Sequence, residues 1–196
     1  MKIGKYELKV IETGVFGLDG GAMFGIIPKP LWSKFNPADD QNRVSLHARN
    51  LLLVSDSRKI LIDTGIGSDW DEKFKQIYRL DQSKLTLSDS LNKLKIKPED
   101  ITDVLLTHLH FDHTGGSTYL KDGNWIPTFP NAKYYVQKKH FEWALNPTDR
   151  DRGSFIQNRY MPLHKEGLLN FIDGDVSFDD EIEFLTINGH TSFQQM

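Results

Sequence analysis

The chain of 196 residues contains no cysteine. Disulfide bonds, thiolate nucleophiles and zinc sites with cysteine ligands are therefore excluded. The chain also lacks a continuous run of about 18 apolar residues, the length that a membrane-spanning helix needs. Its first residues carry no apolar segment of the kind found in signal peptides, so the sequence predicts a cytoplasmic protein that does not enter a membrane.

Positive charge is not in excess either. Lys and Arg number 24 against 27 for Asp and Glu, which gives a formal net charge of −3. Nucleic acids and anionic membrane surfaces are bound mainly by basic surfaces. We therefore expect neither nucleic acid nor a membrane as a partner of this chain.

Motifs of several enzyme classes are absent as well. The sequence has no nucleophile elbow, no P-loop and no dinucleotide-binding fingerprint. The acidic stretch 173–184 does not fit a calcium-binding loop, because Phe178 and Phe184 stand where such a loop needs glycine and glutamate. We interpret this stretch as a solvated acidic turn.

The composition that remains is typical of a globular protein. Hydrophobic residues make up 38% of the chain and charged residues 26%, and the length predicts one domain over residues 1–196. The alternation of strand and helix signals predicts packed layers with the chemistry on the loops. Strands are predicted at 6–16, 44–54, 59–62, 103–107, 132–136 and 182–187. Helices are predicted at 138–145, at 87–94 with Ser88 as the N-cap, and for a turn at 117–120, while 18–37 is expected to be irregular.

The segment 108–113 carries the strongest functional signal. It reads His-Leu-His-Phe-Asp-His, directly after the predicted strand that ends at Thr107. Imidazole is the commonest metal ligand near neutral pH, and a mixture of His and Asp suits zinc, manganese or ferrous iron better than calcium or magnesium. The segment therefore predicts a metal site, with a solvated histidine-rich loop as the alternative.

The spacing within this segment indicates two groups of ligands. His108 and His110 are two residues apart, so on an extended backbone they point the same way and can reach one ion. Asp112 and His113 follow after a turn, which aims them at a neighbouring point. A two-metal site needs such an arrangement, with ions roughly 3.5–4 Å apart.

Three motifs together resemble one protein family. Thr107 to Gly116 resembles the signature of the metallo-β-lactamase-fold hydrolases, Asp63-Thr64-Gly65 is similar to the strand-end motif before it, and Asn188-Gly189-His190-Thr191 to the later Gly-His-Thr element. The segments 17–25 and 28–32 resemble the N-acyl-homoserine-lactone lactonase branch of that family. The resemblance implies an α+β fold, a four-layer αββα sandwich.

The resemblance also implies roles for individual residues. His108, His110 and His190 would hold a first metal, and Asp112 and His113 would belong to a second, with Asp112 also acting in catalysis. The cofactor would be Zn²⁺, with Mn²⁺ or Fe²⁺ as alternatives. A metal-activated hydroxide would attack the carbonyl of a small-molecule lactone or related ester. Glyoxalase-II-like thioester hydrolysis, oxygen chemistry on iron and a non-catalytic remnant are the alternatives, and a homodimer is left open.

One departure from the family pattern concerns the end of the sequence. The family supplies a bridging aspartate and a last histidine after the Gly-His-Thr element, whereas this sequence ends at Met196, and Gln194 stands where many relatives have another histidine. We therefore expect a C-terminally truncated sandwich that lacks most of its second half. Such a chain would bind about one metal, hydrolyse poorly and be marginally stable.

Other candidate residues receive weaker interpretations. Asp63 either orients the metal loop through hydrogen bonds or caps the turn beside Gly65. His47 is expected to lie at the surface or to pack in the core rather than to bind a metal. His164 is expected in a loop, where it could line a pocket, and His140 on a solvated helix face, so that replacing His140 leaves metal binding unchanged. Three aromatic residues are expected to bury the 18–37 loop rather than line an acyl-chain pocket: Phe24, Trp32 and Phe35.

Overall fold

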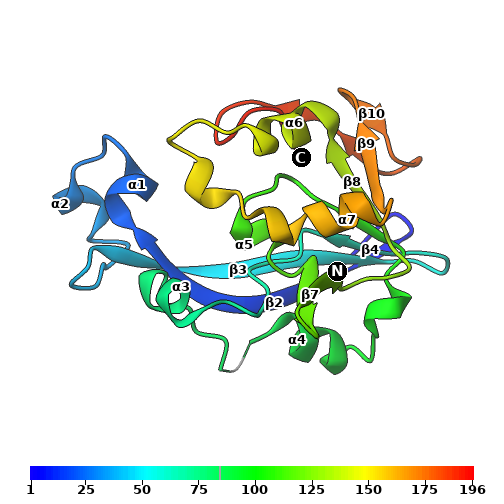
Figure 1. Ribbon diagram of the computed structural model, residues 1–196, viewed down its shortest axis with the longest axis horizontal. Coiled ribbons are helices and arrows are strands. Elements are labelled where there is room, and N and C mark those ends of the chain that lie inside the picture. The colour runs from blue at the N-terminus through cyan, green and yellow to red at the C-terminus, as the bar shows by residue number, and fades with distance from the viewer. Residues whose placement is uncertain (84) are drawn as a thin grey trace.

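The computed structural model describes residues 1–83 and 85–196 (Figure 1). A seven-stranded sheet lies at its centre. The strands in spatial order are β1 (Lys2–Ile3), β2 (Tyr6–Asp19), β3 (Arg43–Val54), β4 (Lys59–Ile62), β5 (Asp103–Leu105), β8 (Lys133–Gln137) and β9 (Leu169–Ile172). The first four strands pair antiparallel, and the pairs β4–β5, β5–β8 and β8–β9 are parallel.

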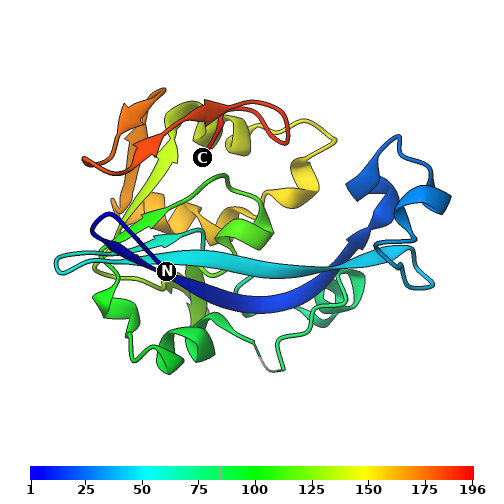
Figure 2. The same ribbon diagram turned by 180° about the vertical axis from the view of Figure 1, so that it is seen from behind.

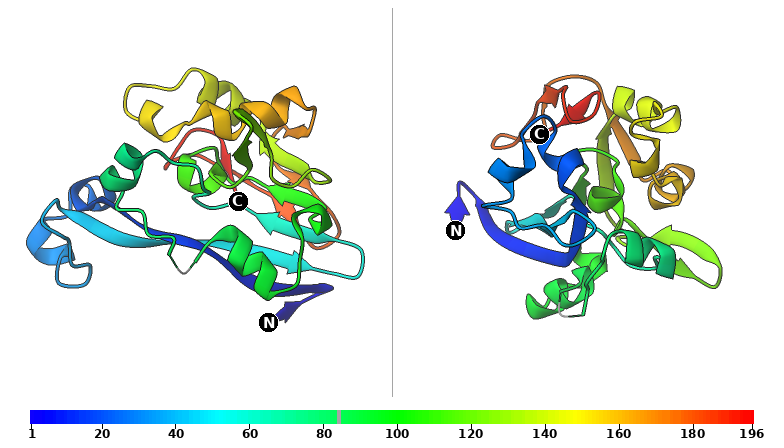
Figure 3. Two further views of the ribbon diagram at one scale, coloured as in Figure 1. Left: turned by 60° about the horizontal axis from the view of Figure 1, so that its bottom comes forward. Right: turned by 90° about the vertical axis from the view of Figure 1, so that its left-hand side faces the viewer.

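The strands β2 and β3 form a long hairpin, and the segment 20–42 that connects them forms an arm. The arm carries two short helices, α1 (Gly20–Phe24) and α2 (Lys29–Trp32), where the sequence predicted only irregular structure. It stands at one end of the molecule in Figures 1 and 2 and in the left panel of Figure 3, and it faces the viewer in the right panel. Phe24 stacks on the buried ring of Trp32 with centroids 4.8 Å apart, as the packing interpretation expected, whereas Phe35 is 83% exposed and does not pack.

The remaining helices connect the strands and cover the sheet. Helix α4 begins at the predicted residue and ends at Lys93, one residue before the predicted end. Thr86 rather than Ser88 caps it, because the Thr86 hydroxyl accepts a hydrogen bond from Asp89 N–H. No helix in the described part of the chain is long and apolar enough to cross a membrane. The helices are α3 (Glu72–Ile77), α4 (Leu87–Lys93), α5 (Phe111–Thr114), α6 (Lys138–Leu145), α7 (Met161–Lys165) and the 3-10 turns η1 (Pro98–Asp100), η2 (Arg152–Ser154) and η3 (Gln157–Arg159).

Two further predictions of local structure were wrong. The predicted helical turn at 117–120 is instead strand β6 (Thr118–Lys121), paired with β7 (Asn124–Pro127) across Asp122-Gly123. Both turn residues have positive φ, as a tight Asp-Gly hairpin requires. The predicted strand 182–187 divides into β11 (Glu183–Phe184) and β12 (Thr186–Ile187), because each piece pairs with a different partner, β10 (Val176–Ser177) and β13 (Gln194–Gln195) respectively.

The sheet buries apolar side chains on both faces. Leu52 and its cross-strand partner Leu61 belong to one core cluster, together with side chains of α4 and α6. Leu53 and its partner Ile60 point to the other face, where they form a second cluster with Phe184. A fully buried side chain of this kind contributes roughly 2 kcal/mol through the hydrophobic effect. The packed sheet is therefore a rigid base for the loops at its edge.

Candidate metal centre

The predicted metal motif lies where β5 leads into α5. Because β4 and β5 are parallel neighbours, their carboxyl ends meet at one edge of the sheet. Asp63, which follows β4, and residues 107–113, which follow β5, are therefore adjacent. Leu106 and Leu109 are fully buried and anchor the segment in the core.

Three of the predicted ligands meet in space. The candidate donor atoms of His108, His110 and His190 all lie within 4.8 Å of one another. His110 Nδ1 lies 3.1 Å from His190 Nε2, although the two residues are 80 positions apart in the sequence. In the part of the chain that the structure describes, this is the one group of three or more such side chains compact enough to hold an ion.

His108 is oriented with its Nε2 atom toward the group. Its Nδ1 atom lies 3.0 Å from the Thr107 hydroxyl, which donates its own proton to Asp63 Oδ2 at 2.9 Å. The Nδ1 atom of His108 therefore carries the proton and donates it to Thr107. The Nε2 atom is buried and has no hydrogen-bond partner among the described residues. A buried nitrogen without a partner is costly, and a cation at this point would satisfy it.

His113 and Asp112 form a second pair of donors beside this group. His113 Nδ1 lies 2.7 Å from Asp63 Oδ2, and His113 Nε2 lies 3.5 Å from Asp112 Oδ2. The free side of the His113 ring thus faces the Asp112 carboxylate. Both residues lie next to the three histidines, where the spacing of the segment predicted a second group of donors.

Asp63 links the two halves of the motif. Its carboxylate accepts hydrogen bonds from the Thr107 N–H at 2.8 Å and from the His113 ring, so it serves the turn backbone and the ligand at once. Its backbone has φ of 57°, a left-handed conformation that is uncommon outside glycine and tends to occur at functional sites. The carboxylate therefore bonds to the segment 107–113, as the first interpretation of Asp63 expected, rather than to the turn beside Gly65.

Burial and neighbouring charges decide the protonation of the imidazoles. Burial, together with the neighbouring imidazoles, lowers the pKa of His110 to about 3 and holds the pKa of His108 far below its usual range. Both rings are neutral at pH 7, which is the form that binds metals. Burial alone would also lower the pKa of His113, but the Asp63 carboxylate raises it to about 9. A cation bound by His113 would have to displace the extra proton that this ring carries at neutral pH.

The predicted position of His140 was wrong. This residue lies on α6 and is fully buried rather than solvated. It lies on the same buried face of the helix as Phe141 and Ala144. The spacing of these apolar residues along α6 was the signal that could have predicted its burial. Leu109 N–H donates to its Nε2 at 2.9 Å, and its Nδ1 lies 2.7 Å from the Ser192 carbonyl oxygen.

The other two histidines lie apart from the cluster. His47 is exposed on β3, where its Nδ1 lies 3.5 Å from a carboxylate oxygen of Glu12, in agreement with the surface position that the sequence allowed. His164 is exposed on α7 rather than in a loop, and its ring contacts Phe141. Neither residue belongs to the group of three donors.

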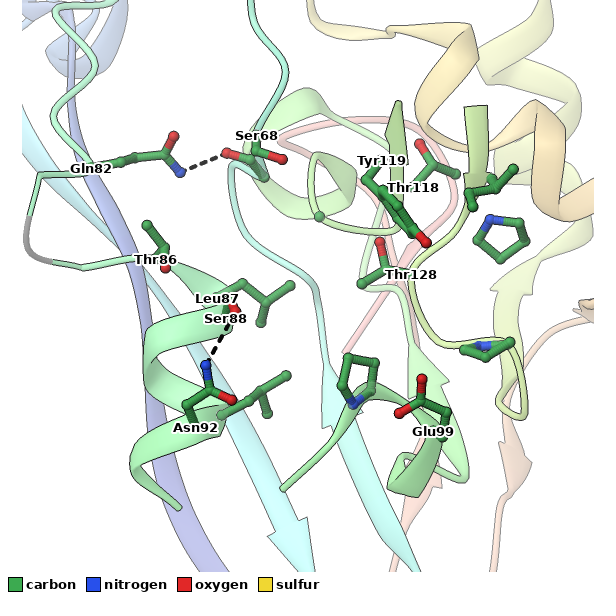
Figure 4. A pocket seen from close by; sticks show the side chains of 17 residues that line it. Ser68, Gln82, Thr86, Leu87, Ser88, Asn92, Glu99, Thr118, Tyr119 and Thr128 are labelled. Carbon is green, nitrogen blue, oxygen red and sulfur yellow. Dashed lines mark hydrogen bonds between the residues drawn. The ribbon is translucent and has the colours of Figure 1, made fainter. Parts of the chain in front are cut away.

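A cleft of about 710 Å³ opens onto the histidine cluster. His110, His190 and Tyr78 line it, together with Leu18 and Met23 from the β2 end and the arm. Burial, with the nearby Asp112 carboxylate, raises the pKa of Tyr78, so this phenol stays protonated at neutral pH. A second cavity of about 740 Å³ lies between α4 and the β6–β7 hairpin, and no histidine lines it (Figure 4).

A buried arginine that the sequence analysis did not identify binds the backbone next to the metal motif. The guanidinium of Arg159 lies between the rings of Trp70 and Trp125, at 3.9 and 4.2 Å from their centroids. It donates to the carbonyl oxygens of Gly115, at the end of α5, and Ser68, in the loop after β4. No local pattern marks such a residue, because its partners are backbone atoms distant in sequence.

Comparisons with known proteins agree with this geometry. Residues 46–194 match the family model described as Metallo-beta-lactamase superfamily. N-acyl homoserine lactonase AttM of Agrobacterium fabrum is 31% identical over 114 residues, which are 55% of this chain and 39% of AttM. The chain therefore spans well under two thirds of that relative.

Solved structures show the same arrangement of elements. A probable metal-dependent hydrolase from Staphylococcus aureus is similar over 100% of this chain and 69% of its own, with a TM-score of 0.88 and 29% identity. An N-acyl homoserine lactone hydrolase with the product N-hexanoyl-L-homoserine bound at its catalytic metal centre covers 98% of this chain and 70% of its own, with a TM-score of 0.70 at 20% identity.

Proposed function

Since the chain belongs to the metallo-β-lactamase superfamily, we propose that it is a metal-dependent hydrolase that opens a lactone or a related ester. One observation carries the proposal: the donor atoms of His108, His110 and His190 lie within 4.8 Å of one another. The buried Nε2 atom of His108 has no other partner among the described residues. A set of neutral imidazoles suits Zn²⁺ best, with Mn²⁺ and Fe²⁺ as alternatives.

The three histidines would hold a first ion. Asp112 and His113 would take part in binding a second, held more weakly because this pair offers two protein donors rather than three. When bound, a divalent cation supplies Lewis acidity, which polarises a carbonyl group and makes water a usable nucleophile near pH 7. We therefore expect the purified chain to retain about one tightly held ion.

The chain's own groups would handle binding and proton transfer. The Asp112 carboxylate lies next to the histidine cluster and would accept the proton of the attacking water, then return it to the leaving oxygen. The Tyr78 phenol in the cleft would remain a hydrogen-bond donor at neutral pH. The cleft volume falls in the range typical of small-molecule sites.

The substrate class is inferred from relatives. AttM is an N-acyl homoserine lactonase, and the structural neighbour described above holds N-hexanoyl-L-homoserine, the product of opening such a lactone. Leu18, Met23 and Ile77 form apolar parts of the cleft wall, on which an acyl chain would pack. We therefore propose an N-acyl homoserine lactone as the first substrate to test.

The test measures metal content and hydrolysis on the same preparation. The purified chain is stripped with a chelator, reloaded with Zn²⁺, Mn²⁺ or Fe²⁺, and assayed on N-hexanoyl-homoserine lactone, a simple lactone and a glutathione thioester. We expect lactone opening that depends on the added ion. His108→Ala should abolish metal retention, whereas His47→Ala, which removes an exposed imidazole outside the cluster, should retain it.

Two results would contradict the proposal in different ways. A chain that binds no divalent ion, or that loses its ion equally in His108→Ala and His47→Ala, would refute the metal site. A chain that holds its ion but hydrolyses only the thioester would favour the glyoxalase-II-like alternative. A chain that holds its ion without turnover of any of the three compounds would be a binding remnant.

A further inference from the structure

His140 lies at the junction of the two segments that carry the histidine cluster. Its side chain is fully buried, and each ring nitrogen contacts one backbone group. On one side is Leu109 N–H, between His108 and His110, at 2.9 Å. On the other is the carbonyl oxygen of Ser192, two residues after His190, at 2.7 Å. One imidazole thus joins the 108–110 segment to the 190–192 loop.

The two contacts define the tautomer of this ring. An amide N–H can only donate, so Nε2 must be the acceptor and carries no proton. A carbonyl oxygen can only accept, so Nδ1 must carry the proton. His140 is therefore a neutral ring with both of its hydrogen-bonding atoms satisfied by backbone. It has no free nitrogen to offer to a metal, and it is not a ligand.

This link is important because the two segments are far apart in the sequence. His110 and His190 are 80 residues apart, and His110 Nδ1 must lie near His190 Nε2 for both to reach one ion. The short β12–β13 pairing and the backbone bond from Gln195 N–H to the Thr107 carbonyl also hold the final loop in place. Among the described residues, His140 is the side chain that bonds to both segments within two residues of the cluster histidines.

We propose that His140 is a positioning residue that sets the separation of His190 from His108 and His110, and thereby the affinity and geometry of the metal site. This inference rests on the proposed function, because it concerns the same metal site. An apolar ring at this position would fill the space but leave Leu109 N–H and Ser192 C=O unpaired in the interior. The two segments would then no longer be joined by hydrogen bonds to one side chain.

Three variants separate the two hydrogen bonds from simple packing. His140→Phe keeps the ring and removes both bonds. His140→Asn places an amide N–H near the Nδ1 position and can restore the bond to Ser192, whereas His140→Gln places an amide oxygen near Nε2 and can restore the bond from Leu109. The matched control is His164→Phe, which changes an exposed imidazole on α7 that contacts Phe141.

The readouts are the Zn²⁺ dissociation constant, from competition with a chromophoric chelator, and the visible spectrum of the protein loaded with Co²⁺, which reports ligand geometry. The melting temperature of the metal-free protein monitors the fold separately. We expect His140→Phe to bind Zn²⁺ about 10–100-fold more weakly, the range typical for partners that orient ligands. The Co²⁺ spectrum should change in His140→Phe, and the amide variants should fall between His140→Phe and wild type.

The outcomes distinguish this inference from the proposed function. If the wild-type chain binds neither Zn²⁺ nor Co²⁺, the proposed metal site is wrong. If the wild type binds both ions and His140→Phe does so with unchanged affinity and spectrum, the positioning role is refuted while the proposed function stands. If His140→Phe does not fold, unchanged affinity and spectrum in both amide variants would refute the positioning role instead.

Discussion

Two side chains that are not themselves predicted ligands orient two of the three imidazoles of the motif, His108 and His113. The Thr107 hydroxyl accepts from His108 Nδ1 and donates to Asp63, and Asp63 also accepts from His113 Nδ1. The first bond leaves His108 Nε2 without a partner among the described residues, and the last leaves His113 Nε2 facing the Asp112 carboxylate. The orientation of His108 and His113 therefore depends on one carboxylate and one hydroxyl.

Replacing Asp63 with Asn should weaken metal binding without disturbing the backbone. Asparagine tolerates the left-handed conformation of residue 63, so the turn is retained. It loses the charge that holds the His113 ring, and such losses commonly cost about 10–100-fold in metal affinity. The measurement is the Zn²⁺ dissociation constant of Asp63→Asn.

Asp56→Asn is the matched control for that comparison, because it removes the same charge in the turn between β3 and β4. It should bind Zn²⁺ as the wild type does. Equal affinity of both variants and wild type would show that Asp63 does not orient the ligands.

At the scale of elements, helix α4 shows how a short helix is attached to the sheet. Leu87 and Leu91 are buried against the core, and the Ser90 hydroxyl donates to the Glu12 carbonyl oxygen of β2 at 2.6 Å. The helix is only seven residues long. A helix this short is unstable alone and depends on its cap and its packing.

Thr86→Ala should lower the free energy of unfolding by about 1 kcal/mol, the usual cost of losing an N-cap. The Thr86 hydroxyl accepts from Asp89 N–H at 3.0 Å, and alanine cannot replace that bond. Urea unfolding followed by circular dichroism measures the difference. Ser88→Ala, within the first turn, should change stability much less, and a larger loss in Ser88→Ala than in Thr86→Ala would restore Ser88 as the cap.

At the scale of the whole molecule, the start of the chain is held by a segment far along the sequence. The Tyr6 hydroxyl donates to Asp179, and the Lys5 ammonium forms ion pairs with Asp179 and Asp180. Lys5 N–H donates to the Glu181 carboxylate at 2.8 Å. The acidic stretch interpreted from the sequence as a solvated turn is therefore a partner of the β1–β2 turn.

This contact should make stability depend on pH. Burial alone would raise the pKa of Asp179, but the hydrogen bond from Tyr6 and the nearby Lys5 ammonium hold it below its usual range. A carboxyl group with a lowered folded-state pKa stabilises the fold above its unfolded pKa of about 3.9, and loses that contribution as the pH falls through the folded value. We expect Asp179→Asn to cost roughly 1–2 kcal/mol at pH 7 and the difference from wild type to shrink below pH 4.

Urea unfolding of wild type and Asp179→Asn between pH 7 and pH 3 measures this effect. The backbone bonds to the Asp179 Oδ1 atom can be kept by the asparagine oxygen, so the turn itself is preserved. Asp173→Asn, an exposed change of the same charge, should follow the wild-type curve. A stability difference for Asp179→Asn that stays constant over this pH range would contradict the assignment.

Features coded by neighbouring residues could be predicted from the sequence. The range 138–145 is helix α6 and 59–62 is strand β4, and the family match together with the similar solved structures confirms the predicted metallo-β-lactamase type of fold. The two-residue spacing of His108 and His110 placed both on one side of an extended segment, and both are donors of one group. Local spacing was enough here because the interacting residues are neighbours in the sequence, although metal ligation itself stays a prediction.

Features that depend on distant partners were decided only by the tertiary structure. The apolar spacing along α6 could have placed His140 in the core, but nothing local shows that Leu109 and Ser192 converge on its ring. The same holds for the division of the last predicted strand, whereas the approach of His190 to His110 was expected from the resemblance to the family and not from local spacing. In each case burial and pairing are properties of the whole packed sheet, because the free energy of satisfying a polar group depends on which distant backbone atoms the fold brings to it.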